Sequence, residues 1–203
     1  QGERQTDLLS EEVDGERAEK TGTVVLFKPD DEIFPEIQYD FAVLSQRFKE
    51  MAYLNKGLSI KFRSDRHLNL WPANQVSYYF DGGIANLVRN FNRNRRVMQQ
   101  LPFYYEKTID DTMVEVAVQY NDSFTETVFS FANCINTQEG GTHVSGLKAA
   151  LTRTLNSYAT RQNLAKDLKE SIGGDDIREG LTAVISVKIP HPQFEGQTKP
   201  KLG

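Results

Sequence analysis

One stretch near the end of the 203-residue sequence constrains the fold more than any other. Apolar residues at positions 181, 183, 185, 187 and 189 alternate with Thr182, Val184, Ser186 and Lys188. A period of two with many β-branched side chains predicts a strand with one thoroughly buried face. Pro190 and Pro192 end the strand, because proline cannot donate a hydrogen bond to a neighbouring strand. The segment therefore predicts a core strand of a sheet.

The loop after this strand carries three polar residues, Gln197, Thr198 and Lys199, behind the permissive backbone of Gly196. A lysine presents a compact positive charge and a glutamine amide donates a hydrogen bond, so the pair could bind an anion. The alternative is a solvated lysine on a loop without a ligand. Three residues alone do not decide between these interpretations.

The first third of the chain contains a short strand, a helix and a second strand. Residues 24–27 form an apolar run that ends before Pro29 and predict a strand. Apolar residues spaced three and four apart predict an amphipathic helix over residues 39–55, and residues 58–62 alternate as a strand. Residues 64–75, with Pro72 and two asparagines, indicate a linker between two domains.

The second part of the chain combines strands with two helices. A Gly82-Gly83 turn precedes a helix, three strands follow with turns at residues 110–111 and 121–122, and a long helix spans about residues 144–162. Its apolar stripe consists of Leu147, Leu151, Leu155 and Tyr158. Strands that lead to a long helix and back to a strand predict an α+β fold with helices on one face of the sheet.

Four arginines, Arg89, Arg93, Arg95 and Arg96, lie within eight residues at the end of the first of these helices. Positive side chains near a helix C-terminus complement the helix dipole, and this account requires no ligand. Contact with nucleic-acid phosphates is the alternative, because guanidinium groups suit phosphate oxygens. The net charge of −4 argues against a general polyanion binder, so any DNA contact must be local.

Several classes of protein are excluded or unsupported. The single cysteine, Cys134, permits no internal disulfide, and the three histidines are far apart, so no metal site is expected. The sequence has no apolar run long enough for a membrane span and no signal peptide, which favours a cytoplasmic protein without a membrane partner. It also lacks the P-loop and the Rossmann glycine pattern.

Five blocks, taken in order, resemble the gyrase B subunits of bacterial type IIA topoisomerases. They are TGTVVLFKPD, EMAYLNKGLSI, YYFDGGIANLVRNFNRN, FANCINTQEGGTHVSGLKAALTRTLNSYA and EGLTAVISVKIPHPQFEGQTKPKLG, and they cover most of residues 21–203. The resemblance implies that residues 1–66 are the C-terminal part of a GHKL ATPase domain. It also implies that residues 67–203 are a transducer domain of the ribosomal-protein type with a left-handed βαβ crossover.

The resemblance also implies ligands and partners. Gln197 and Lys199 would contact the γ-phosphate of ATP and act in catalysis, Gly22 and Thr23 would line the adenine pocket, and Arg93, Arg95 and Arg96 would face double-stranded DNA. ATP and Mg²⁺ would be the cofactors, with the Mg²⁺ ligands outside this sequence. The subunit would form a homodimer through its ATPase region and a heterotetramer with the gyrase A subunit.

Such a chain would couple ATP binding and hydrolysis to closure of the DNA entry gate and to strand passage. It lacks the segments that carry the general-base glutamate and the glycine-rich lid, so this sequence alone is expected to be inactive. Two alternatives stay open: the ATPase subunit of topoisomerase IV, and a non-catalytic nucleic-acid-binding α+β module. Another GHKL relative, such as a mismatch-repair ATPase or a chaperone, is disfavoured by the Q-T-K loop with its companion blocks.

Overall fold

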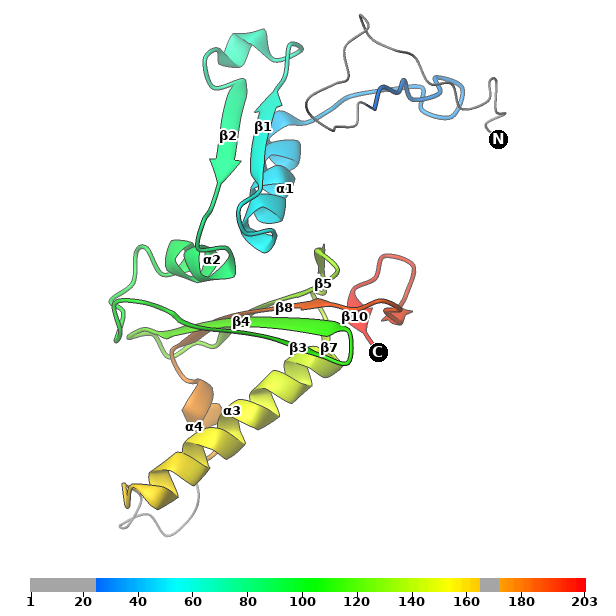
Figure 1. Cartoon of the computed structure of the whole chain (residues 1–203). Coiled ribbons are helices and arrows are strands. Elements are labelled where there is room, and N and C mark those ends of the chain that lie inside the picture. Colours follow the sequence, from blue (N-terminus) through cyan, green and yellow to red (C-terminus); the bar gives the residue numbers. More distant parts are fainter. Residues whose placement is uncertain (1–24, 165–171) are drawn as a thin grey trace, which may run out of the picture. The chain divides into compact units, whose positions relative to one another are not determined.

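The computed structural model describes residues 25–164 and 172–203, shown in colour in Figure 1. The described residues divide into two units, with residues 25–39 in the first and those from residue 40 onward in the second. In the first unit, residues 25–27 form no strand, and the Leu26 side chain is 95% exposed. The strand predicted over residues 24–27 is therefore wrong for its described part. A strand needs a hydrogen-bonded neighbour, and none is present within residues 25–39.

The second unit begins with helix α1 (Phe41–Leu54), which confirms the helix predicted for this segment. Asp40 caps it, because the Asp40 carboxylate accepts a hydrogen bond from the Val43 N–H at 2.9 Å. Strand β1 (Ser59–Arg63) follows as predicted and pairs antiparallel with β2 (Gln75–Tyr79). The segment expected to be a linker instead connects these paired strands and contains the short helix η1 (Leu68–Leu70). The domain boundary between residues 66 and 67 stays a prediction.

A five-stranded sheet organises the rest of the unit, in the order β3-β4-β8-β5-β6. Strand β8 lies between β4, to which it is antiparallel, and β5, to which it is parallel. Strands β4 and β5 are consecutive in sequence but not neighbours, so the turn expected at residues 121–122 joins no hairpin. The strands are β3 (Phe103–Ile109), β4 (Thr112–Tyr120), β5 (Thr127–Ala132), β6 (Ile135–Asn136) and β8 (Leu181–Lys188).

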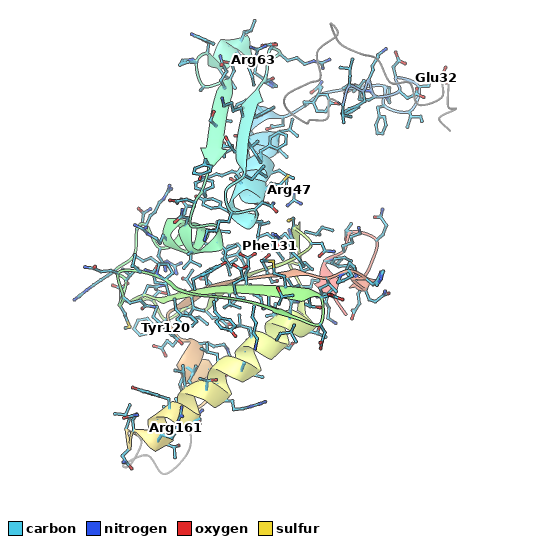
Figure 2. The ribbon with its side chains drawn as sticks, in the orientation of Figure 1. Glu32, Arg47, Arg63, Tyr120, Phe131 and Arg161 are labelled. Carbon is cyan, nitrogen blue, oxygen red and sulfur yellow. The ribbon has the colours of Figure 1, made fainter. Side chains whose placement is uncertain are left out.

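Helices cover both faces of this sheet (Figure 1). Helix α2 (Ile84–Phe91) packs on one face, where Ile84, Leu87 and Val88 are buried. Helices α3 (Thr142–Arg161) and α4 (Gly174–Arg178) lie on the other face. Figure 2 shows Phe131 on the α2 side and Tyr120 on the α3 side. The α+β class is confirmed, but the expectation of helices on one face only is wrong.

The two covered faces explain why β8 is buried along nearly its whole length rather than on one face. Leu181 and Ala183 pack toward α3, whereas Val184 belongs to the core beneath α2. Thr182 shares the face of Val184 and is buried. Its hydroxyl accepts a hydrogen bond from the buried Asn121 side chain and donates one to the buried Asn92 side chain, so its polar group is satisfied. The parallel strands β5 and β8 are joined through α3, which gives the expected βαβ connection; its left-handedness stays a prediction.

Helix α3 packs less tightly than its sequence suggests. Leu147 and Leu151 contact the sheet, but the Tyr158 side chain is 49% exposed, so its predicted place in the buried stripe is wrong. The neighbouring Ala159 is buried instead. An apolar cavity of about 820 Å³ lies between α3 and strands β3, β4 and β8. The better packed core is therefore the one beneath α2.

Replacing Ile84 by alanine is expected to destabilise the chain strongly. Ile84 is fully buried in the core beneath α2, and truncation of such a side chain costs about 2–5 kcal/mol through lost burial and the resulting cavity. Urea unfolding followed by circular dichroism measures the change. Val43→Ala, at an exposed position of α1, is the control, with an expected change within about 0.5 kcal/mol. Equal midpoints for Ile84→Ala and wild type would contradict the core assignment.

Candidate functional site

The Gln197-Thr198-Lys199 segment forms the tip of a short β-hairpin, which we call the QTK hairpin (residues 194–202). Strands β9 (Phe194–Glu195) and β10 (Lys201–Leu202) pair antiparallel. The Lys199 N–H donates to the Gly196 carbonyl oxygen at 3.2 Å, which closes the turn. Gly196 and Lys199 both adopt positive φ angles, of 77° and 56°. The glycine accommodates its angle without strain, so the sequence at this position suits the tight turn.

The base of the QTK hairpin is fixed to the start of α3. Strand β10 pairs in parallel with β7 (Gly140–Gly141), which leads directly into the helix. The Glu139 N–H donates to the Pro200 carbonyl oxygen at 2.9 Å, and the Thr142 hydroxyl donates to the Gly203 carbonyl oxygen at 2.9 Å. These bonds hold the hairpin at the end of the sheet where β8 ends. The tip is thus presented from a rigid base.

The tip exposes three polar side chains, Gln197, Thr198 and Lys199. The ion pair of this hairpin joins Glu195 and Lys201 at 3.1 Å. The Lys199 ammonium has no carboxylate partner among the described residues and lies 5.6 Å from the centre of the Phe194 ring. An exposed cation of this kind gains little from the ring, about 0.5–1 kcal/mol. It therefore remains available to an incoming anion.

Those of the other predicted site residues that the structure describes do not gather around this tip. Gly22 and Thr23 lie outside the described residues. Arg93, Arg95 and Arg96 follow the end of α2, near the point where β4 ends, because the Asp122 N–H donates to the Arg96 carbonyl oxygen at 3.0 Å. Since β8 begins beside the end of β4 and finishes at the QTK hairpin, the arginines lie at the opposite end of the sheet. The structure thus separates two candidate sites.

A buried polar network, which sequence reasoning missed, holds the arginine segment on the sheet. The Asn92 side chain donates to Gln119 Oε1 at 2.9 Å and accepts from the side chains of Asn121 and Thr182 at 3.1 and 2.9 Å. All four residues are buried. The sequence signal that could have indicated this network is the set of Asn and Gln side chains inside or beside apolar strands. Most buried side-chain amides in proteins are hydrogen-bonded, as these are.

Within the described part of the chain, no group of three or more His, Cys, Asp or Glu side chains is placed to hold a metal ion. In the same residues, no helix combines the length and apolar character required to cross a bilayer. Cys134 is a free, partly buried thiol in the tight turn between β5 and β6, rather than inside a strand.

His143, in the first turn of α3, predicts a pH dependence of stability. Burial lowers its pKa, and its Nδ1 atom is buried without a partner in the described structure. As the pH falls, the His143 imidazole is therefore protonated at a higher pH in the unfolded chain than in the folded chain. The free energy of unfolding should consequently fall as the pH drops below about 6.5.

Urea midpoints measured across this pH range would test the histidine, because the remaining titrations are common to wild type and variant. His143→Gln should flatten the fall in stability relative to wild type. His191→Gln, at an exposed position, should leave it unchanged. An identical pH profile for His143→Gln would remove this residue as the cause.

The sequence of this chain is similar to the sequences of DNA gyrase B proteins. The family model for DNA gyrase B matches residues 83–203. The DNA gyrase B protein of Clostridium acetobutylicum is 49% identical over 187 residues, which are 92% of this chain and 29% of that protein. The corresponding protein of Streptococcus pneumoniae is 50% identical over 186 residues, 91% of this chain and 28% of that protein. The chain therefore spans under a third of the length of these curated relatives.

The structure of this chain is similar to solved structures from the same group of proteins. The 43K ATPase domain of Thermus thermophilus gyrase B is similar with a TM-score of 0.76 and 35% identity, over 87% of this chain and 46% of that one. The topoisomerase IV ATP-binding domain of Francisella tularensis gives 0.68 and 28% identity, over 86% and 45%. The chain thus has the fold of part of the ATPase region of type II DNA topoisomerases. Within that class, the chain belongs to the DNA gyrase B family.

Proposed function

We propose that this chain is the coupling part of a gyrase B subunit, which transmits the state of bound ATP to the DNA gate. The free ammonium of Lys199 on the anchored QTK hairpin is the observation that carries this proposal. In the complete subunit, Lys199 contacts the γ-phosphate of ATP and Gln197 adds a neutral hydrogen bond. Loss of that phosphate would release the hairpin, so hydrolysis would bias two arrangements of the neighbouring domains.

The assignment includes cofactors and partners. Residues 1–66 belong to the ATPase domain, where Gly22 and Thr23 contribute to the adenine pocket, and residues 67–203 form the transducer domain. ATP and Mg²⁺ are the cofactors, and the Mg²⁺ ligands come from other segments of the subunit. The subunit dimerises through its ATPase region, acts on double-stranded DNA with the gyrase A subunit and works in the cytoplasm. The names of the curated relatives favour gyrase B over topoisomerase IV.

A chimaera tests the proposal directly. Residues 21–203 would replace the matching stretch of the Clostridium acetobutylicum gyrase B protein, which is 49% identical. With the gyrase A subunit and ATP, the chimaera should supercoil relaxed plasmid, whereas the isolated chain should hydrolyse no ATP. A well-folded chimaera with ATP turnover but no supercoiling would contradict the coupling role. Tight DNA binding by the isolated chain with a steep salt dependence would favour the nucleic-acid-binding module.

The arginines after α2 carry the proposed DNA contact. Replacing Arg93, Arg95 and Arg96 by glutamine in the complete subunit should weaken DNA-stimulated ATP turnover and flatten its salt dependence, because each lost phosphate contact lowers the salt slope by about one. Basal turnover without DNA should persist, since these residues lie at the far end of the sheet from Lys199. Unchanged DNA stimulation would leave the arginines as solvated surface charges.

A further inference from the structure

An open pocket of about 610 Å³ with both polar and apolar walls lies beside the C-terminal end of α2. Three arginines, Arg89, Arg93 and Arg95, line it together with the amide side chains of Asn90 and Gln100. Tyr53 of α1 and Gln119 of β4 also belong to the lining. Arg96 is not among the lining residues, so three of the four clustered arginines lie at the pocket and the fourth lies outside it.

The pocket has an uncompensated positive charge. Among the described residues that line it, none is acidic. No described carboxylate forms an ion pair with Arg89, Arg93 or Arg95, whereas Arg47, Arg63 and Arg178 each have an acidic partner. Three like charges at one pocket repel one another, and an anion bound among them would relieve that repulsion.

The backbone that carries these arginines is fixed before any ligand arrives. The Arg95 N–H donates to the Asn92 carbonyl oxygen at 2.9 Å, and the Met98 N–H donates to the Tyr120 carbonyl oxygen at 2.9 Å. Asn92 is itself held by the buried network with Gln119, Asn121 and Thr182. A fixed backbone lowers the entropy lost on binding, because a ligand then has to order only the exposed arginine side chains.

The hydroxyl of Tyr53, which lines the pocket, is affected by the same positive charge. Tyr53 stacks on Phe80 with ring centres 3.6 Å apart, which fixes its position. Burial raises the pKa of the Tyr53 hydroxyl, and the positive charge of Arg93 opposes that rise. The guanidinium of Arg93 therefore acts on the hydroxyl, which adds a neutral hydrogen-bond donor beside the arginines.

We propose that this pocket is a phosphate-binding site, in which Arg89, Arg93 and Arg95 hold the oxygens of one phosphate group. Arginine suits this ligand because its planar fork donates two parallel hydrogen bonds to phosphate oxygens. The phosphate comes either from the backbone of a DNA duplex or from a free phosphorylated small molecule. The site deepens the DNA contact of the proposed function, but it binds phosphate whether or not Lys199 acts on ATP.

Titration of the ¹⁵N-labelled chain with sodium pyrophosphate at constant ionic strength tests the site by NMR. Side-chain amide signals of Asn90, Gln100 and Gln119 should shift and saturate. Arg89→Gln/Arg93→Gln should weaken the affinity at least about tenfold, which is the scale for loss of a charge-assisted hydrogen bond. The matched control, Arg153→Gln/Arg161→Gln, removes the same charge from exposed positions on α3 and should change the affinity less than about twofold.

A second titration separates the two sources of phosphate. Displacement of pyrophosphate by a short DNA duplex would assign the site to the DNA backbone, and failure to displace it would assign the site to a free phosphate compound. Preserved dispersion of the NMR spectrum shows that both double variants are folded. Equal weakening by the two double variants, or shifts that never saturate, would overturn the site. Because no ATP turnover is measured, this result is independent of the Lys199 test.

Discussion

Lys199→Ala is expected to lower ATP turnover by about 10²–10³-fold in a complete gyrase B subunit, the usual effect of removing one electrostatic stabiliser. The negative charge on the transferring phosphoryl group spreads over its outer oxygens in the transition state, so a nearby ammonium acts most strongly there. The structure leaves this ammonium without a carboxylate partner among the described residues, at the tip of the QTK hairpin. Steady-state turnover at saturating ATP measures the effect.

Two further substitutions sharpen this experiment. Gln197→Ala removes a neutral hydrogen bond and should reduce turnover less than Lys199→Ala does. Lys107→Ala, at an exposed position of β3, removes the same charge from another part of the sheet and should leave turnover unchanged. ATP binding should largely survive in all three variants, because in the proposed site other segments hold the adenine and inner phosphates. Normal turnover in Lys199→Ala would refute the catalytic role of the hairpin.

The local elements of the fold could be predicted from the sequence because their signals are local. The apolar spacing of α1 and α2 and the alternation in β8 each lie within one short window, and the structure contains all three elements. The insertion of β8 between β4 and β5 depends on contacts between distant segments. No window of sequence contains that information, so the covering of both faces of the sheet was missed.

The buried polar residues show most clearly that local patterns do not reveal contacts between distant segments. Thr182 and Ser186 look solvent-exposed in an alternating pattern, yet both are buried, on the same face of β8 as Val184 of the core beneath α2. Thr182 is hydrogen-bonded to Asn92, 90 residues earlier in the chain. Asn92 in turn positions the arginine segment. The charge cluster was visible in the sequence, but the pocket that it lines requires the fold.

The QTK hairpin, by contrast, was recognisable as a motif, while its attachment to α3 was not. The turn itself is local and contains a glycine at a positive φ angle. The attachment depends on β7, two glycines whose pairing with β10 joins segments about 60 residues apart and leaves no local pattern in the sequence. The pairing of β7 with β10 connects the hairpin to α3, the longest helix among the described residues. Movement of the tip would therefore be transmitted to the helix as well as to β8.

Gly141→Ala should test this attachment, with an expected fall in ATP turnover of about 10²-fold in the complete subunit. Gly141 has a φ angle of 140°, and a Cβ atom there would overlap the Leu202 carbonyl oxygen. Backbone atoms cannot yield as a flexible side chain can, so β7 and β10 must separate. A displacement of about 1 Å at a catalytic group costs rates of this size. Faster hydrogen exchange at the amides of β10 should accompany the loss.

Gly146→Ala is the matched control, because it adds the same methyl group to a glycine five positions later on α3. A Cβ atom at Gly146 meets no atom within 4 Å, and alanine in a helix interior is more stable than glycine by about 0.5–1 kcal/mol. This variant should keep full turnover and raise the unfolding midpoint. If Gly141→Ala kept full turnover while exchange at β10 increased, the tip would act without its anchor, and the rigid base would be unnecessary for catalysis.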